Sequence, residues 1–201
     1  MAQIKKEHIN NKILEVSKKL LISYGYEKMS MRKISSEVGV SVSNLYNYYK
    51  NKEAVLQALV GDKSNALLSL KISEDMLPSD FTKEGFLSYL DHIMSYIVSW
   101  LDENKELMII LLLKVKGSSY ENFEERFINH YLEFEMSGLS LIDVELELPS
   151  EHLISQLLMM YFNTIKHYLM YDLDIEWLKK HVKEMNHFVV GGLVNANTNA
   201  N

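Results

Sequence analysis

The stretch that decides the fold is Ser30–Tyr49, with the sequence SMRKISSEVGVSVSNLYNYY. A serine at an N-cap position precedes each of two predicted short helices, Met31–Val38 and Val42–Tyr48. Gly39 lies between them, where a tight turn favours a residue without a Cβ atom. Two short helices joined by a turn of three or four residues that contains glycine form a helix-turn-helix, so this stretch predicts that motif.

The second of these helices has the side chains that a DNA-reading helix needs. A helix that enters the major groove points its N-terminal end at base edges, so it cannot be apolar on every side. Leu45 is placed to face the core, whereas Tyr46 and Tyr48 carry hydroxyls suited to phosphate oxygens, although Tyr46 could equally pack. The candidate base contacts are the small or hydrogen-bonding side chains Val42, Ser43, Asn44 and Asn47.

The charge distribution separates this segment from the rest of the chain. Residues 1–60 carry ten Lys or Arg and five Glu, a net charge of +5. Residues 61–201 carry eleven Lys or Arg and twenty-two Asp or Glu, a net charge of -11. A basic segment on an acidic body indicates a polyanionic partner for the first part alone, and the alternative is an uneven composition of solvated helix faces.

The sequence resembles the TetR (TetR/AcrR-type) family of bacterial transcriptional regulators between Ile13 and Leu56. The residues that carry the resemblance are Gly25-Tyr26, Met29–Ile34, Val38–Ser41, Leu45–Tyr49 and Lys52-Glu53. Departures from the family pattern include Ser43, where glycine is frequent, and Asn44, where threonine is frequent, and they leave the operator sequence open. The alternative is a helical hairpin that only packs, with its serines acting as caps and nothing else.

The resemblance implies DNA-binding roles for the matched positions. The recognition-helix set becomes Ser41, Val42, Ser43, Asn44, Tyr46, Asn47 and Tyr48, with Ser41 as the cap. The DNA-phosphate set becomes Ser30, Arg32, Lys33 and Lys52. Lys52 also qualifies on physical grounds, because it lies in the first turn of the next predicted helix, where free backbone N–H groups suit an anion.

Helical periodicity continues through the remaining sequence, and no alternating strand pattern is visible. We predict an all-α fold of about nine helices, divided into an N-terminal three-helix DNA-binding head with the helix-turn-helix and a C-terminal helical body for ligand binding and dimerisation. The predicted domains are a head over 1–52, linked by a long helix over 52–70, a body over 53–193, and a disordered tail over 194–201. The other predicted helices cover residues 5–24, 80–103 and 105–116, a stretch from a capping box at Ser118 and Glu121 to about Val144, Glu151–Tyr171, and a last helix from an Asp174 cap to Gly191 and Gly192.

The composition and the motifs also restrict which other functions the protein can have. The chain has no cysteine, which excludes disulfides and fits a reducing cytoplasm, the location that we expect. We expect no secretory signal in residues 1–20 and no membrane span. No paired metal-binding histidine motif, phosphate-binding glycine loop or nucleophile elbow is visible, so we expect neither an enzyme nor a cofactor or metal.

Aromatic and methionine side chains are abundant on candidate inner faces of the body. Core packing is their default role, but a cavity for a small hydrophobic or aromatic effector would be built from the same residue types. Gln156, Asn163 and His167 share one stripe of their helix, and if buried they could bind a ligand, pair across a dimer seam or pair with neighbouring helices. The candidate pocket residues are Tyr96, Trp100, Phe127, Tyr131, Gln156, Met160, Asn163 and His167. Glu135 flanks an apolar stripe, so it is either a surface residue or has a cationic partner.

A twofold partner is expected because one recognition helix reads too few bases, so a palindromic DNA site needs a homodimer. The resemblance implies a dimer through the last two long helices, with Leu158, Tyr161, Ile165, Trp177, His181 and Phe188 as candidate interface residues.

Together these features predict a sequence-specific transcriptional repressor that a small molecule releases from its operator by tilting the helix that starts at Lys52. The alternatives are a DNA-binding protein without an effector, and a helical enzyme or small-molecule-binding protein with a vestigial head.

Overall fold

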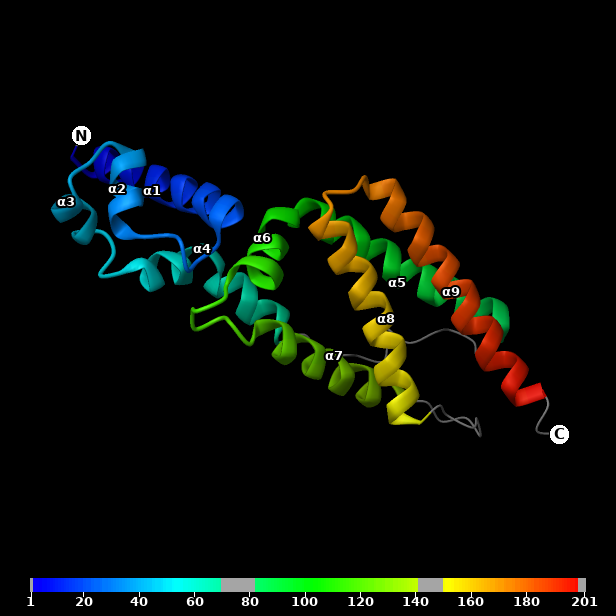
Figure 1. The fold of residues 1–201 in the computed structure, drawn as a ribbon. Coiled ribbons are helices and arrows are strands. Elements are labelled where there is room, and N and C mark those ends of the chain that lie inside the picture. The colour runs from blue at the N-terminus through cyan, green and yellow to red at the C-terminus, as the bar shows by residue number, and fades with distance from the viewer. Residues whose placement is uncertain (1, 70–81, 141–149, 199–201) are drawn as a thin grey trace. The chain divides into compact units, whose positions relative to one another are not determined.

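The computed structural model describes residues 2–69, 82–140 and 150–198, and within these ranges all regular elements are helices (Figure 1). The predicted all-α fold is confirmed. None of the described helices is long and apolar enough to cross a bilayer. The elements in chain order are α1 (Ala2–Tyr24), α2 (Met31–Val38), α3 (Val42–Tyr46), α4 (Lys52–Leu67), α5 (Lys83–Glu103), α6 (Lys105–Ile109), a π-helix (Ile110–Lys114), α7 (Phe123–Ser140), α8 (Glu151–Met170) and α9 (Ile175–Thr198).

The chain divides into two compact units, and the division is not a single cut in the sequence. Unit 1 contains Met1–Ser69 together with Glu106–Glu124, and unit 2 contains Leu70–Lys105 together with Glu125–Asn201. The helix-turn-helix therefore shares its unit with all of α4 and with the segment from α6 to the start of α7.

Unit 1 is held by apolar side chains from four helices. α1 packs on α2, on α4 and on the π-helix, and α2 packs on α3. Ile13, Leu21, Ile34, Leu45 and Leu56 are completely buried where these helices meet. Each such side chain contributes about 1.5–3 kcal/mol on leaving water, so even the five-residue α3 has a firm anchor in Leu45.

Unit 2 is built around α9, which packs on both α5 and α8. Tyr168 of α8 and Leu178 of α9 are completely buried, and Val98 of α5 and Val190 of α9 are nearly so. α9 thus provides the apolar stripe on which the other two helices pack.

The starts of α2, α4 and α8, which depend on a local cap, were predicted correctly. Ser30, Asn51 and Ser150 accept hydrogen bonds from the backbone N–H three residues ahead, and α2, α4 and α8 begin directly after them. Asp174 likewise accepts from the Glu176 N–H at 2.7 Å, just before α9.

Three predicted helix ends were wrong. α3 ends at Tyr46 instead of Tyr48, because the Asn47 and Tyr48 N–H groups bond to carbonyls three residues back and tighten the chain into a turn. The capping box at Ser118 does not form, because the Ser118 hydroxyl accepts from the Tyr120 N–H at 3.1 Å and the Glu121 N–H donates to the Ser118 carbonyl at 3.2 Å, so these residues form a turn and α7 begins at Phe123. α9 continues through its glycines to Thr198, and the predicted end of α7 near Val144 lies outside the described residues.

Candidate nucleic-acid interface

The recognition helix is fixed on one side and open on the other. Gly39 has the left-handed φ of +79° that the turn between α2 and α3 requires, and this conformation is costly for residues with a Cβ atom. The Ser41 hydroxyl caps α3 by accepting from the Asn44 N–H at 3.1 Å. With Leu45 completely buried, α3 is held as a short rod against α2.

The predicted base-contacting side chains lie on the open side of α3. Ser41, Ser43 and Asn47 are exposed, and Tyr46 is 52 % exposed. Val42, Asn44 and Tyr48 are half-buried at the edges of the same helix. A rod with an apolar anchor and small polar side chains outside has the form that a major groove admits.

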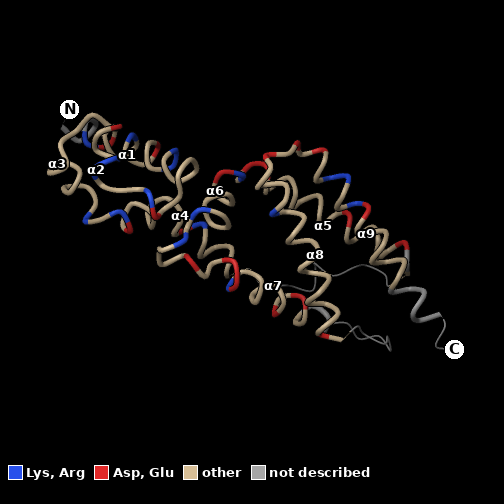
Figure 2. Tube along the Cα trace, viewed as in Figure 1, with Lys and Arg blue, Asp and Glu red and all other residues tan. Residues whose placement is uncertain are grey.

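The residues predicted to contact phosphates differ in their exposure and in the hydrogen bonds that they already make within the protein. Arg32 and Lys33 are exposed on α2, and the Lys33 ammonium donates to the Lys28 carbonyl at 2.9 Å. Ser30 is half-buried and serves as the α2 cap. The Lys52 ammonium donates to the Tyr26 carbonyl at 2.9 Å and lies 4.0 Å from the centre of the Tyr26 ring. Lys and Arg residues follow α1, α2 and the start of α4 in Figure 2.

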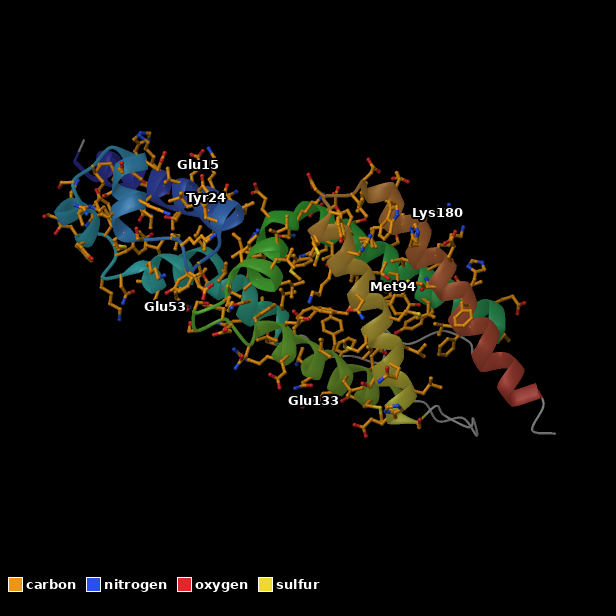
Figure 3. All side chains as sticks on the ribbon, viewed as in Figure 1. Glu15, Tyr24, Glu53, Met94, Glu133 and Lys180 are labelled. Carbon is orange, nitrogen blue, oxygen red and sulfur yellow. The ribbon has the colours of Figure 1, made fainter. Side chains whose placement is uncertain are left out.

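A polar clamp on Glu53, which the sequence did not predict, joins α4 to the segment before α7. The Glu53 carboxylate accepts hydrogen bonds from the Tyr26 hydroxyl, the Ser119 hydroxyl and the Ser119 N–H, the last at 3.2 Å (Figure 3). Tyr26 is 5 % exposed, and its N–H donates to the Lys114 carbonyl at 2.8 Å. Glu53 follows Lys52 in the family-like motif, and that position was the only signal available in the sequence.

The hydrogen bonds of this clamp determine the ionisation of both partners. Burial tends to raise the pKa of Glu53, but the hydrogen bonds from Ser119 and Tyr26 outweigh it and lower that pKa. Burial and the Glu53 carboxylate raise the pKa of the Tyr26 hydroxyl. At neutral pH the clamp therefore consists of an ionised carboxylate and a protonated phenol.

In unit 2, two aromatic members of the predicted pocket set, Phe127 and Tyr131, lie in contact. The Phe127 and Tyr131 rings on α7 lie 4.7 Å apart between centroids, and Phe127 lies 6.0 Å from the Phe162 ring on α8. Trp100 and Met160 are half-buried. The Phe127, Tyr131 and Phe162 rings form an apolar cluster between α7 and α8.

The polar members of the pocket set lie on exposed faces of their helices. Gln156, Asn163 and His167 are exposed on α8, and Tyr96 is 71 % exposed on α5. The spacing placed the three α8 residues on one stripe, and this stripe is left exposed in the chain. Met170 continues this open stripe at 56 % exposure.

The candidate dimer residues fall into two groups. Leu158 and Ile165 are half-buried, whereas Phe188 is 74 % exposed on α9. The Trp177 and His181 rings stack at 3.9 Å between centroids, and His167 lies 5.4 Å from the same tryptophan. The hydroxyl of Tyr161 donates to Asn186 within the same chain at 2.7 Å. The structure thus joins His167, expected in the pocket, with two residues expected at the interface.

The described residues form helices only, and they include a helix-turn-helix. Its second helix is buried on one side at Leu45 and exposed on the other. These features place the protein in the helix-turn-helix class of DNA-binding proteins. A family model described as "Bacterial regulatory proteins, tetR family" matches residues 13–59. This match covers the helix-turn-helix segment and confirms the resemblance to the family that the sequence predicted.

A curated relative, the "Fatty acid metabolism regulator protein" of Bacillus subtilis (strain 168), is 27 % identical over 109 residues. That match spans about half of each protein, 54 % of this chain and 54 % of the relative. The crystal structure of FadR from Bacillus subtilis in complex with stearoyl-CoA is similar, with a TM-score of 0.56 and 22 % identity over 87 % of this chain and 96 % of that one. NalD, the secondary repressor of the MexAB-OprM multidrug efflux pump in Pseudomonas aeruginosa, has a TM-score of 0.62 and 18 % identity over 90 % of this chain and 95 % of that one. At these identities the structural likeness concerns the fold.

Proposed function

We propose that this chain is a transcriptional repressor that binds a palindromic DNA site as a homodimer and is released from it by a small hydrophobic or aromatic effector. The observation that carries the proposal is α3, whose exposed Ser43, Tyr46 and Asn47 surround a completely buried Leu45. Two such helices, related by a twofold axis, read two half-sites.

The phosphate contacts supply affinity that does not depend on sequence. Arg32 and Lys33 are exposed on α2, the helix that precedes α3, and their positive charges contribute to the affinity for the DNA backbone. Lys52 acts from a fixed position, since one of its three N–H donors is used by the Tyr26 carbonyl and the others remain for a phosphate. Ser30 and Ser41 contribute chiefly as caps that set the ends of α2 and α3.

The homodimer is supported by apolar side chains that a lone chain leaves in water. Leu153 and Met170 of α8 and Phe188 of α9 are between 44 % and 74 % exposed. Exposed apolar patches on otherwise well-packed helices mark protein–protein interfaces. Phe188→Asp should therefore convert the dimer to a monomer in sedimentation equilibrium and abolish tight binding to a two-half-site duplex.

An effector in unit 2 is supported by the aromatic cluster of α7 and α8 and by the relatives. FadR of Bacillus subtilis was solved in complex with stearoyl-CoA, so a similar fold can hold a compound with a long apolar chain. Ligand and DNA then favour different dimer geometries, and each weakens the binding of the other to the same extent.

The test of DNA recognition uses a duplex selected by the wild-type protein from a random-sequence pool. Arg32→Ala should weaken binding to every duplex and reduce the slope of log affinity against log salt by about 1. Asn47→Ala should change the preferred bases, at a cost of about 1–3 kcal/mol at the position that it contacts.

The matched control is Lys180→Ala, which removes the same charge as Arg32→Ala from exposed α9 (Figure 3). It should leave both the affinity and the base preference unchanged. The assignment of α3 fails if Asn47→Ala selects the same duplexes as the wild type and Arg32→Ala binds like Lys180→Ala.

A further inference from the structure

Tyr26 lies in unit 1 between the lysine predicted to contact a phosphate and the clamp on Glu53. It belongs to the turn between α1 and α2 and is 5 % exposed. Its carbonyl oxygen accepts a hydrogen bond from the Lys52 ammonium at 2.9 Å, and the same ammonium lies 4.0 Å from the centre of its ring. One buried tyrosine thus holds the Lys52 ammonium by a charge-assisted hydrogen bond and by a cation–π contact.

Tyr26 is itself fixed by contacts on several sides. Its N–H donates to the Lys114 carbonyl at 2.8 Å, and its hydroxyl donates to the Glu53 carboxylate. Gly25, directly before it, has a left-handed φ of +77°, and a Cβ atom there would lie 3.7 Å from the Lys114 carbonyl oxygen. Since the Ser119 hydroxyl and N–H also donate to Glu53, the position of Tyr26 depends on residues 114–119 as well as on α4.

Lys33, another residue predicted to contact a phosphate, shows how a less firmly held ammonium looks. It donates to the Lys28 carbonyl at 2.9 Å and lies 5.5 Å from the centre of the Tyr24 ring. Lys28 and Lys33 are exposed, however, and Tyr24 is 58 % exposed, so water competes for the Lys33 ammonium. A cation–π contact is stronger where water is excluded, as at the buried Tyr26.

Holding a lysine in place before DNA binds increases its contribution to affinity. A free lysine side chain has many rotamers, and it loses much of this freedom when its ammonium binds a phosphate. Lys52 is half-buried and already restrained by Tyr26, so it has less freedom to lose. The gain depends on Tyr26, although the burial of Tyr26 keeps this residue itself away from a ligand of the surface.

We propose that Tyr26 is a positioning residue for DNA binding, which holds the Lys52 ammonium in place for a phosphate oxygen. The inference rests on the proposed role of Lys52 as a phosphate contact and names the residue on which that contact depends. Because Glu53 and Ser119 hold Tyr26, the DNA affinity also depends on the segment 114–119, which lies far from the helix-turn-helix in sequence.

The test is a double-mutant cycle on the duplex that the wild type selects. Lys52→Met removes the charge but keeps an unbranched side chain, and Tyr26→Leu removes the ring but keeps an apolar one. Tyr26→Leu should weaken binding about fivefold and make log affinity fall less steeply with log salt, because Lys52 neutralises its phosphate less completely. In the Lys52→Met background, Tyr26→Leu should change neither quantity further.

Two further variants separate positioning from stability. Tyr26→Phe keeps the ring over Lys52 and should retain most of the affinity. Leu67→Ala removes a buried side chain at the opposite end of α4, so it should lower the free energy of unfolding but keep the wild-type affinity and salt dependence. The proposal is overturned if Lys52→Met binds like the wild type, if Tyr26→Leu weakens binding equally in both backgrounds, or if Leu67→Ala alters the salt dependence as Tyr26→Leu does.

A measurement on the wild type decides the question should Tyr26→Leu fail to fold. With ¹³C at the lysine Cε atoms, the Lys52 resonance is identified by its loss in Lys52→Met. The ring current of Tyr26 should shift it upfield both in the free protein and in the complex with the duplex, and no such shift in the complex would overturn the proposal. A wild type that selects no duplex would overturn the proposed function and this inference together, whereas an additive cycle would overturn the inference alone.

Discussion

Glu53 in unit 1 and Glu135 in unit 2 are both half-buried glutamates on helices, yet their surroundings are opposite. Glu53 accepts three hydrogen bonds, from Tyr26 and Ser119, which lower its pKa despite burial. Glu135 accepts no such hydrogen bonds within the described residues, and burial raises its pKa. A partly buried carboxylate can therefore stabilise a fold or weaken it, and the number of donors aimed at it determines which.

The largest effect expected from this comparison is that of Glu53→Ala. The substitution leaves the Tyr26 hydroxyl and the Ser119 N–H without their acceptor, so the free energy of unfolding should fall by about 2–3 kcal/mol. Urea unfolding followed by circular dichroism measures it. Asp62→Ala, at an exposed site on the same α4, should stay within about 0.5 kcal/mol of the wild type. Equal losses in the two variants would show that the clamp contributes nothing.

In the absence of any ligand, Glu135→Gln should have the opposite effect and raise the free energy of unfolding. A neutral amide of the same shape removes the cost of a poorly solvated charge, so the variant should be more stable at pH 7 by about 1 kcal/mol, or roughly 2–4 °C in Tm. Differential scanning calorimetry of the two proteins gives the comparison. A variant less stable than the wild type would mean that donors already compensate the Glu135 carboxylate.

The pH dependence should separate the two glutamates further. Because the folded pKa of Glu53 is depressed, its contribution to stability is complete above its unfolded value near 4.5 and is lost as pH falls through the folded pKa. Because the folded pKa of Glu135 is raised, the advantage of Glu135→Gln is absent well below pH 4.5 and develops as pH rises through the folded pKa. Between pH 3 and 7, the difference in free energy of unfolding between Glu135→Gln and the wild type should therefore grow as the pH rises. Parallel curves would contradict the assigned environment.

The sequence predicted those parts of the structure that depend on near neighbours. The caps Ser30 and Asn51 act on N–H groups three residues away, so the starts of α2 and α4 could be read directly from the sequence. The Ser118 hydroxyl accepts from the N–H of Tyr120, two residues ahead, instead of that of Glu121, so it closes a turn and does not open α7. Local patterns thus identify candidate caps but do not decide which nearby N–H group donates to them.

Long-range partners and the direction of a helix face could not be predicted in this way. Ser119 lies 66 residues from Glu53, and no periodicity connects them. The spacing of Gln156, Asn163 and His167 placed them on one stripe of α8, but it could not tell that this stripe would remain exposed. Periodicity defines a face of a helix, whereas only the packing of the other helices decides which face is buried.

The smallest expected change in the free energy of unfolding is that of Gly61→Ala. Gly61 lies on α4, as Glu53 does, and the substitution tests how closely α4 packs at this position. A Cβ atom at this position would lie 2.3 Å from the Gln57 side-chain nitrogen and 3.4 Å from the Tyr120 hydroxyl, which donates to Gln57. Gly61→Ala gains about 1 kcal/mol in helix propensity, while displacing the flexible Gln57 amide loses a hydrogen bond worth about 0.5–1.5 kcal/mol. The two terms nearly cancel, so urea unfolding should show a change below about 0.5 kcal/mol.

In a Gln57→Ala background the hydrogen bond is already absent, and Gly61→Ala should then stabilise the protein by the full propensity term. An equal effect in both backgrounds would show that Gln57 does not hold Tyr120, and the polar contacts between α4 and the 114–120 segment would then be confined to Glu53.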